Sequence, residues 1–290
     1  MKKVFLIVLY LNISFTYSQT LSNNVIKEYE DTLIIIYEKI NNTSSIEEKK
    51  IYSNAFKNEL LEVLKYKESY DYQFNELESI SILSPEDNSF KIYNWFHKEE
   101  NKYKYHAIVV KQNKSQYNTI IHLTDNSEKI TNPEYEVLSN KNWYGALYYK
   151  IFTIDKGKNK THLLFGWDGY NITNNRRIID VINIENDTIK FGKKIFKERD
   201  NIKSRVILTY NENTSINLQY DKNEKSIIFD NLHVINNNKE NSSVLIPDGS
   251  SNAYRYKNKF FNLLNNVEVR NKNSQKNIRT GKINKGLFPK

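Results

Sequence analysis

The stretch 205–229, RVILTYNENTSINLQYDKNEKSIIF, holds three apolar segments separated by two polar ones. Residues 205–210, 215–220 and 226–229 are rich in β-branched and aromatic side chains, which favour strands. The two segments between them are rich in Asn, Asp and Glu, as turns between neighbouring strands often are. We therefore predict an antiparallel meander of three strands in this part of the chain.

The same strand-like pattern extends on both sides of this stretch. A period of two, typical of half-buried strands, begins near residue 76. Residues 144–152 are apolar or aromatic on both faces, which predicts a strand in the middle of a sandwich, a barrel or a covered sheet. We expect a mainly β fold, an antiparallel meander, sandwich or barrel-like domain over residues 76–270. Its predicted strands cover 78–83, 89–96, 103–111, 117–124, 144–154, 161–168, 176–184, 203–210, 214–220 and 225–230.

Residues 19–75 have a helical pattern instead. Apolar side chains recur at helical spacing in two runs, 26–40 and 52–64. A polar link, residues 41–43, joins them, and Ser44 or Ser45 with a glutamate three residues later is typical of a helix start. The two runs predict an antiparallel helical hairpin that packs on the β domain.

The two ends of the chain differ from the rest. Residues 1–18 combine Lys2 and Lys3 with an apolar run and end on the small side chain of Ser18, the pattern of a secretory signal peptide. An N-terminal membrane anchor is the alternative, although the apolar run is shorter than the roughly 20 residues that span a bilayer. Residues 271–290 lose all periodicity and form a basic tail. We expect an exported protein, periplasmic or secreted, with no transmembrane segment in the mature chain.

Composition limits the classes of function. The chain of 290 residues has no cysteine, which excludes disulfides, thiolate metal sites and thiol catalysis. Its formal net charge is +9, but lysines alternate with acidic residues along most of the chain, so we expect no nucleic-acid partner. The five histidines are isolated and no phosphate-binding or nucleophile motif occurs, so we predict no metal and no cofactor.

The strongest local motif surrounds Trp167 and Asp168, which Gly166 and Gly169 flank. An indole beside a carboxylate suits a sugar, because the ring stacks on its apolar face and the carboxylate accepts hydrogen bonds from its hydroxyls. In the alternative interpretation the Asp-Gly pair forms a turn and Trp167 packs in the core. Trp143 and Tyr144, beside small residues, form a second aromatic site that either lines a groove or belongs to the core.

An enzymatic function needs a different arrangement. Glycoside hydrolysis uses two carboxylates separated by about 5–10 Å. Asp168, Asp180 and Asp230 are the candidates, since each lies within or at the end of a predicted strand. Asp180 stands among apolar residues, so burial that perturbs its pKa is one interpretation, and pairing with Arg176, Arg177 or Arg205 is the other.

Four segments resemble a family of exported proteins from Bacteroidetes, mainly flavobacteria, that has no characterised activity. The resemblance covers roughly residues 90–255 and lies in 91–95 (KIYNW), 143–150 (WYGALYYK), 164–169 (LFGWDG) and 227–230 (IIFD). It implies export and supplies no activity.

We therefore expect an envelope-associated protein that binds a protein partner or a glycan, with Trp143, Tyr144, Trp167 and Asp168 as candidate ligand-binding residues. The alternative function is a glycan-acting hydrolase that uses Asp168 with Asp180 or Asp230. A purely structural envelope protein is the third possibility.

Overall fold

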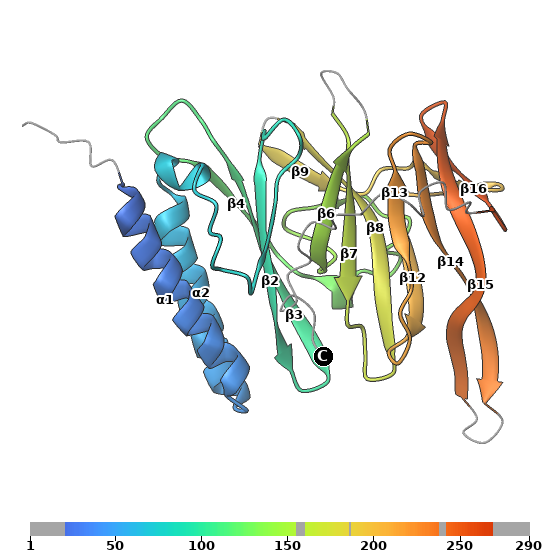
Figure 1. Ribbon diagram of the computed structural model, residues 1–290, viewed down its shortest axis with the longest axis horizontal. Helices are drawn as coiled ribbons and strands as arrows, with labels where there is room; N and C mark the ends of the chain where they lie inside the picture. Colours follow the sequence, from blue (N-terminus) through green and yellow to red (C-terminus); the bar gives the residue numbers. More distant parts are fainter. Residues whose placement is uncertain (1–20, 155–159, 186, 238–241, 269–290) are drawn as a thin grey trace, which may run out of the picture.

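The computed structural model describes residues 21–154, 160–185, 187–237 and 242–268, so the predicted signal peptide (1–18) and basic tail (271–290) lie outside the described residues. The chain forms four layers, a helical hairpin followed by three stacked sheets, which Figure 1 shows from left to right. The prediction of a mainly β fold with an N-terminal helical hairpin is confirmed.

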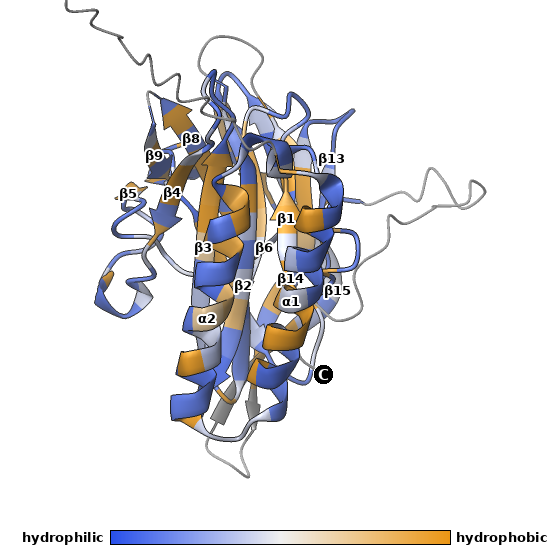
Figure 2. Ribbon diagram, turned by 90° about the vertical axis from the view of Figure 1, so that its left-hand side faces the viewer, coloured by the Kyte–Doolittle hydropathy of each residue, from blue (hydrophilic) through white to orange (hydrophobic). Residues whose placement is uncertain are grey.

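The helical layer consists of α1 (Asn23–Asn42) and α2 (Ile46–Leu64). Ser22 and Ser45 cap the two helices, since each side chain accepts a hydrogen bond from a backbone N–H in the first turn. The apolar stripes of the two helices pack against β2 and β3, in front of which the helices lie in Figure 2. Phe56 contacts both Tyr37 and Trp95, which ties the helices to the sheet.

Sheet 1 lies directly behind the helices and is fully antiparallel. In its strand order it consists of β1 (Ser81–Leu83), β2 (Lys91–Glu99), β3 (Lys102–Lys111) and β4 (Thr119–Leu123). One face packs on the helices and the other on sheet 2, so β2 is buried along most of its length.

Sheet 2 is the middle layer of the β domain. In its strand order it consists of β5 (Leu138–Ser139), β9 (Thr188–Phe191), β8 (Asn174–Glu185), β7 (His162–Asp168) and β6 (Leu147–Thr153), with β12 (Val206–Asn211) also paired to β8. All seven residues of β7 are buried because sheets 1 and 3 cover its two faces. The strand predicted within 144–154 is β6, which ends this strand order and is partly exposed beyond Tyr148, so the central buried strand is β7 instead.

Sheet 3 is the outer layer. In its strand order it consists of β11 (Asn201–Lys203), β10 (Phe196–Glu198), β16 (Phe260–Leu264), β15 (Ser242–Lys257), β14 (Ser226–Asn237) and β13 (Leu218–Asp221). The sequence patterns did not predict β5, β9, β10, β11, β15 or β16. All neighbours are antiparallel except β10 and β16, which are parallel.

The predicted three-strand meander over 205–229 is wrong in one connection. β13 and β14 pair as predicted, but β12 pairs with β8 in sheet 2. The chain therefore crosses from sheet 2 to sheet 3 between Asn211 and Leu218. Val206 and Leu218 meet in the same core from opposite sheets, so packing between sheets replaces pairing within one sheet.

Candidate functional site

The four predicted ligand-binding residues lie together between sheets 1 and 2. Trp143 and Tyr144 precede β6, and Trp167 and Asp168 end β7. Their exposed fractions are 0% for Trp143, 3% for Tyr144, 5% for Trp167 and 8% for Asp168. The structure brings them together, but it buries them.

The two indoles serve packing. The Trp167 ring packs edge-on against Tyr103 and tilted against Phe96, with centroid separations of 5.2 and 5.8 Å. The Trp143 Nε1–H donates to the Tyr148 hydroxyl at 3.0 Å in the core. Protein atoms therefore cover both rings, so the structure shows neither an indole free to stack on a sugar at Trp167 nor a groove lined by Trp143. The core interpretation, which the sequence left open, describes both residues.

Gly169 is needed here for close packing. A Cβ at this position would lie 2.3 Å from the Tyr103 ring and 2.8 Å from Trp167, far inside van der Waals contact. The glycine therefore lets the aromatic side chains close over the end of β7.

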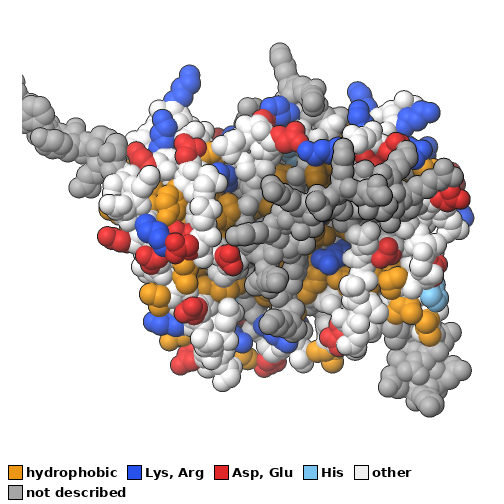
Figure 3. All heavy atoms as spheres, in the orientation of Figure 1, with side chains coloured by type: hydrophobic (Ala, Val, Ile, Leu, Met, Phe, Trp, Pro, Cys, Tyr) orange, Lys and Arg blue, Asp and Glu red, His pale blue; other side chains and the backbone are white. Residues whose placement is uncertain are grey.

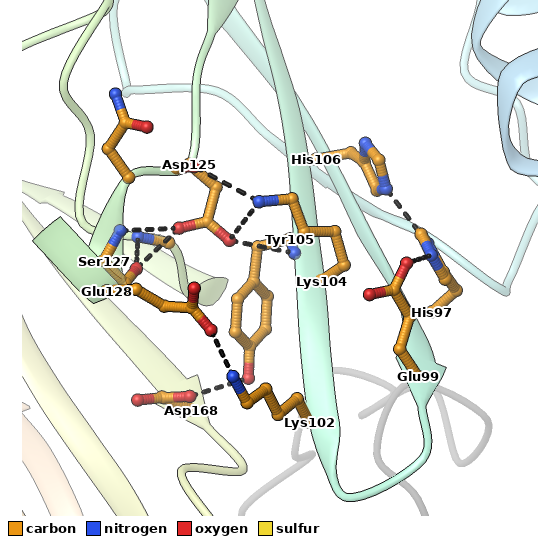
Figure 4. Close-up of polar contacts among 12 residues, drawn as sticks. His97, Glu99, Lys102, Lys104, Tyr105, His106, Asp125, Ser127, Glu128 and Asp168 are labelled. Atoms are coloured by element: carbon orange, nitrogen blue, oxygen red, sulfur yellow. Dashed lines mark hydrogen bonds and ion pairs between the residues drawn. The ribbon is translucent and has the colours of Figure 1, made fainter. Parts of the chain in front are cut away.

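Asp168 is the one carboxylate among these four residues. The Tyr105 hydroxyl donates to its Oδ1 at 3.0 Å and accepts from the Gly169 N–H at 2.9 Å, as part of the contacts drawn in Figure 4. Arg176 Nη1 lies 3.9 Å from its Oδ2 and donates to the Tyr144 hydroxyl at 2.6 Å. The Arg176 guanidinium also covers one face of the half-exposed Tyr170 ring, 3.2 Å from its centroid.

Burial raises the pKa of Asp168 to about 6, although the nearby Arg176 charge and the hydrogen bond from Tyr105 lower it. The carboxyl can therefore gain or lose a proton close to neutral pH, which suits a general acid or base. Such a pKa is also the ordinary result of burial with incomplete pairing.

Asp180 has a structural environment. Its side chain and that of Arg205 are both 0% exposed, and Arg205 Nε donates to Asp180 Oδ2 at 2.8 Å. The Tyr148 hydroxyl donates to the same oxygen at 3.1 Å, and Arg205 also donates to the Pro133 carbonyl. Of the two interpretations that the sequence allowed, pairing with an arginine is the one observed.

The three candidate carboxylates are not brought together. Asp180 of β8 pairs with Leu164 of β7, and Leu164 lies four residues before Asp168 in the same strand. Four residues span about 13 Å along a strand. Asp230 lies in sheet 3, where it accepts a hydrogen bond from the Asn217 N–H at 2.7 Å. Asp168 and Asp180 are thus farther apart than the roughly 5–10 Å that paired glycosidase carboxylates need.

A histidine pair that the sequence did not indicate lies under α2. His97 Nδ1 and His106 Nε2 are 3.0 Å apart and His97 Nε2 lies 3.1 Å from Glu99 (Figure 4). The same His106 nitrogen lies 3.2 Å from Ser53 of α2. Burial lowers the pKa of His106 to about 3 and also lowers that of His97. Neighbouring strands place the two rings side by side, so only strand pairing could reveal them.

Two surface features also escaped sequence reasoning. The first is the arm, defined as residues 230–237 of β14 and 242–251 of β15, which projects beyond the rest of sheet 3 in Figure 1. The second is the β8–β9 groove, a cavity of about 550 Å³ lined by polar and lysine side chains. The alternation in 182–191 was a usable signal for the groove, because it marks one polar face.

The described residues include no group of three histidine or acidic side chains that could hold one metal ion. In the same part of the chain, no helix is long and apolar enough to cross a bilayer. Comparison with known proteins finds no matching family model, no similar curated protein and no similar solved structure.

Proposed function

We propose that this is an exported, non-catalytic binding protein of the cell envelope, and that it holds an extended segment of a partner polypeptide along the arm. The observation that carries the proposal is a two-stranded ribbon with apolar side chains in solvent. Export follows from the signal-peptide pattern of residues 1–18 and agrees with the family resemblance.

The arm exposes two neighbouring β-branched side chains to solvent. Val234 is 56% exposed and Ile235 is 43% exposed, and these neighbours point to opposite faces of the ribbon. Leu232, Leu245 and Ile246 are partly buried. Figure 3 shows hydrophobic side chains and a histidine gathered over the lower part of β14 and β15. Apolar groups clustered on a projecting element are typical of a protein-binding surface.

The backbone of the arm is available for pairing as well. β13 pairs with β14 only over residues 226–229, and β16 pairs with β15 only over 253–257. Within the described residues, the outer edges of 232–237 and 242–250 therefore have no strand beside them. A ribbon of two strands is marginally stable by itself, and an added strand would satisfy its edge and cover its apolar side chains.

The chemistry of the arm defines the partner. Between Leu232 and Pro247 the described residues include no Asp, Glu, Lys or Arg. We therefore expect an extended, uncharged segment with apolar side chains at alternate positions, bound mainly through main-chain hydrogen bonds.

The experiment uses the chain from Gln19 and a nine-residue peptide of alternating valine and threonine, followed by amide hydrogen exchange. At about 1 mM peptide we expect exchange in 232–237 or 242–250 to slow about tenfold. Val234→Lys should abolish the protection, whereas Ile51→Lys, at a 63% exposed position of α2, should leave it intact. A version of the peptide with a central proline is the matched ligand control.

Unchanged exchange with the strand-forming peptide would overturn the proposal. Protection that appears without peptide as protein concentration rises would also overturn it, since a second copy of this chain would then be the occupant. Equal loss of protection in the two lysine variants would mean that the effect does not belong to the arm.

The hydrolase alternative rests on the pKa of Asp168, about 6, beside Tyr105 and Arg176. No described partner among the candidate carboxylates lies within reach of it, so we rank this function second. Turnover of envelope polysaccharides that Asp168→Asn lowers by several orders of magnitude would favour it.

A further inference from the structure

We propose a second binding site, the β8–β9 groove, and infer that it takes an acidic saccharide, a sugar that carries a carboxylate, sulfate or phosphate group. The cavity of about 550 Å³ has the size of a small-molecule site. Its lining combines three lysines, an amide, a hydroxyl and one apolar side chain: Lys190, Lys193, Lys194, Asn183, Thr188 and Val137.

The groove follows from the pairing of β8 with β9. Asn183 faces Lys190 and Glu185 faces Thr188 across the hairpin, so these four side chains share one face. The opposite face carries Ile182, Ile189 and Phe191 into the core between sheets 1 and 2. One side of the hairpin is thus fixed by apolar burial, and the polar side lines the groove.

Gly192 forms the turn between β9 and the two lysines Lys193 and Lys194 at the groove. Its φ of +84° is favourable for glycine alone, and a Cβ there would lie 3.0 Å from the Glu136 carbonyl oxygen. The Gly192 N–H donates to the Val181 carbonyl at 2.8 Å, and the Lys193 N–H donates to the Ser204 carbonyl at 3.0 Å. The turn that presents Lys193 and Lys194 is therefore held by backbone contacts.

The groove has an excess of positive charge. Lys190 and Lys194 are exposed, and neither forms an ion pair with any described residue. Lys193 differs, since its ammonium donates to the Thr161 hydroxyl at 2.8 Å. Glu185 is the one acidic side chain of the lining, against three lysines. In sheet 3, by contrast, Lys203 lies between Glu134 and Glu198.

The remaining groups select the kind of anion. Asn183 and Thr188 can donate and accept hydrogen bonds, as sugar hydroxyls require. Val137 is 49% exposed at the same cavity and offers an apolar contact for the C–H face of a sugar ring. Lys190 and Lys194 supply charge-assisted hydrogen bonds to the acidic group. A simple inorganic anion would use the lysines and leave the other three groups unused.

The test measures binding of three defined probes by calorimetry: a galacturonic acid trisaccharide, a galactose trisaccharide and inorganic phosphate. We expect the acidic trisaccharide to bind and the neutral one to bind at least tenfold more weakly. A Lys190→Ala/Lys194→Ala variant should weaken acidic binding at least tenfold, since it removes both charge-assisted hydrogen bonds to the acidic group. A Lys114→Ala/Lys197→Ala variant removes the same charge from two exposed lysines that form no ion pair with a described residue, and it should bind like the parent.

A sulfated trisaccharide and a sugar phosphate extend the series and identify which acidic group is preferred. Tighter binding of any acidic saccharide than of phosphate supports the proposal. Equal binding of phosphate and all acidic saccharides overturns it, because the site would then hold only an anion. Equal losses in the two double variants, or no binding of any acidic saccharide, also overturn it. The arm lies in β14 and β15, so none of these outcomes decides whether the arm binds a polypeptide.

Discussion

Asp168 and Asp180 belong to neighbouring strands of sheet 2 and face the same layer of side chains, yet their surroundings differ. Asp180 is fully buried and contacts Arg205 directly, whereas Asp168 lies at the end of β7 with its arginine 3.9 Å away. The Asp180–Arg205 pair is fully buried. At the end of β7, burial raises the pKa of Asp168, and the Arg176 charge offsets this only in part. Position along the strand therefore gives one residue type two different roles.

The largest expected effect is at the closed pair. Arg205→Ala leaves the Asp180 carboxylate buried without its cation, and we expect it to lower the free energy of unfolding by about 3–5 kcal/mol. Urea denaturation measures this. The joint replacement Asp180→Leu/Arg205→Met should cost less than Arg205→Ala alone. A loss for Arg176→Ala as large as that for Arg205→Ala would remove the distinction between the two regions.

The second prediction concerns pH and Asp168. Its pKa is higher in the folded protein, about 6, than in the unfolded chain, so folding favours the protonated carboxyl. Its contribution to stability is complete below about pH 4 and is lost as pH rises through 6. We expect the difference in unfolding free energy between wild type and Asp168→Asn to change by roughly 2–3 kcal/mol over this window, in favour of the variant at pH 7.

Stability curves at pH 4, 5, 6 and 7 test the second prediction. A constant difference between the two proteins over this range would mean that the carboxyl is ionised as readily in the folded state as in the unfolded chain.

The third prediction compares two tyrosine hydroxyls. Tyr148→Phe strands the Trp143 indole N–H and removes a donor from Asp180, both in the core, so we expect a loss of about 1–3 kcal/mol. Tyr105→Phe removes the contacts to Asp168 and Gly169 at the end of β7, where the Asp168 side chain is 12% exposed rather than fully buried, and should cost about 1 kcal/mol. Thermal unfolding of both variants at one pH gives the order, and the reverse order would contradict our comparison.

The smallest expected effect concerns the Arg176 charge beside Asp168. Arg176→Gln removes the cation nearest to Asp168 and should raise the pKa of Asp168 further, by about one unit. Carbon-13 NMR titration of the carboxyl measures it. Lys104→Gln is the control, because Lys104 lies 3.7 Å from Asp125 instead. An unchanged titration in Arg176→Gln would show that burial alone sets the pKa.

Local patterns predicted the helical hairpin and most strands of sheets 1 and 2. The helices followed from apolar spacing and from the capping pattern at Ser44 or Ser45, of which Ser45 is the cap, and the strands followed from a period of two. Prediction failed where short or irregular strands pair with distant ones, as in β10 and β16, whose contact joins Phe196 to Phe261. The hydrophobic periodicity of a strand indicates how many of its faces are buried, but it does not indicate which strand pairs with it.

The candidate site shows the same limit. The sequence singled out Trp167 and Asp168 from their flanking glycines, and the structure places both in one aromatic cluster. Whether the indole would be exposed depended on Tyr103 and Phe96, which lie more than 60 residues earlier in the chain and reach it only when sheets 1 and 2 stack. The lysines of the β8–β9 groove could be read from the sequence, but only the pairing of β8 with β9 shows that they line one cavity.

The sequence by itself determined the fold class, the helical hairpin, the absence of disulfides and thiol sites, and the position of Asp180 among apolar residues. These properties depend on composition and on residues close together in the chain, and the sequence shows both directly. The stacking of three sheets decided which carboxylate is paired, which indoles are covered, and where apolar and cationic groups stay in solvent. Those outcomes depend on contacts between residues far apart in the chain, and only the tertiary structure creates them.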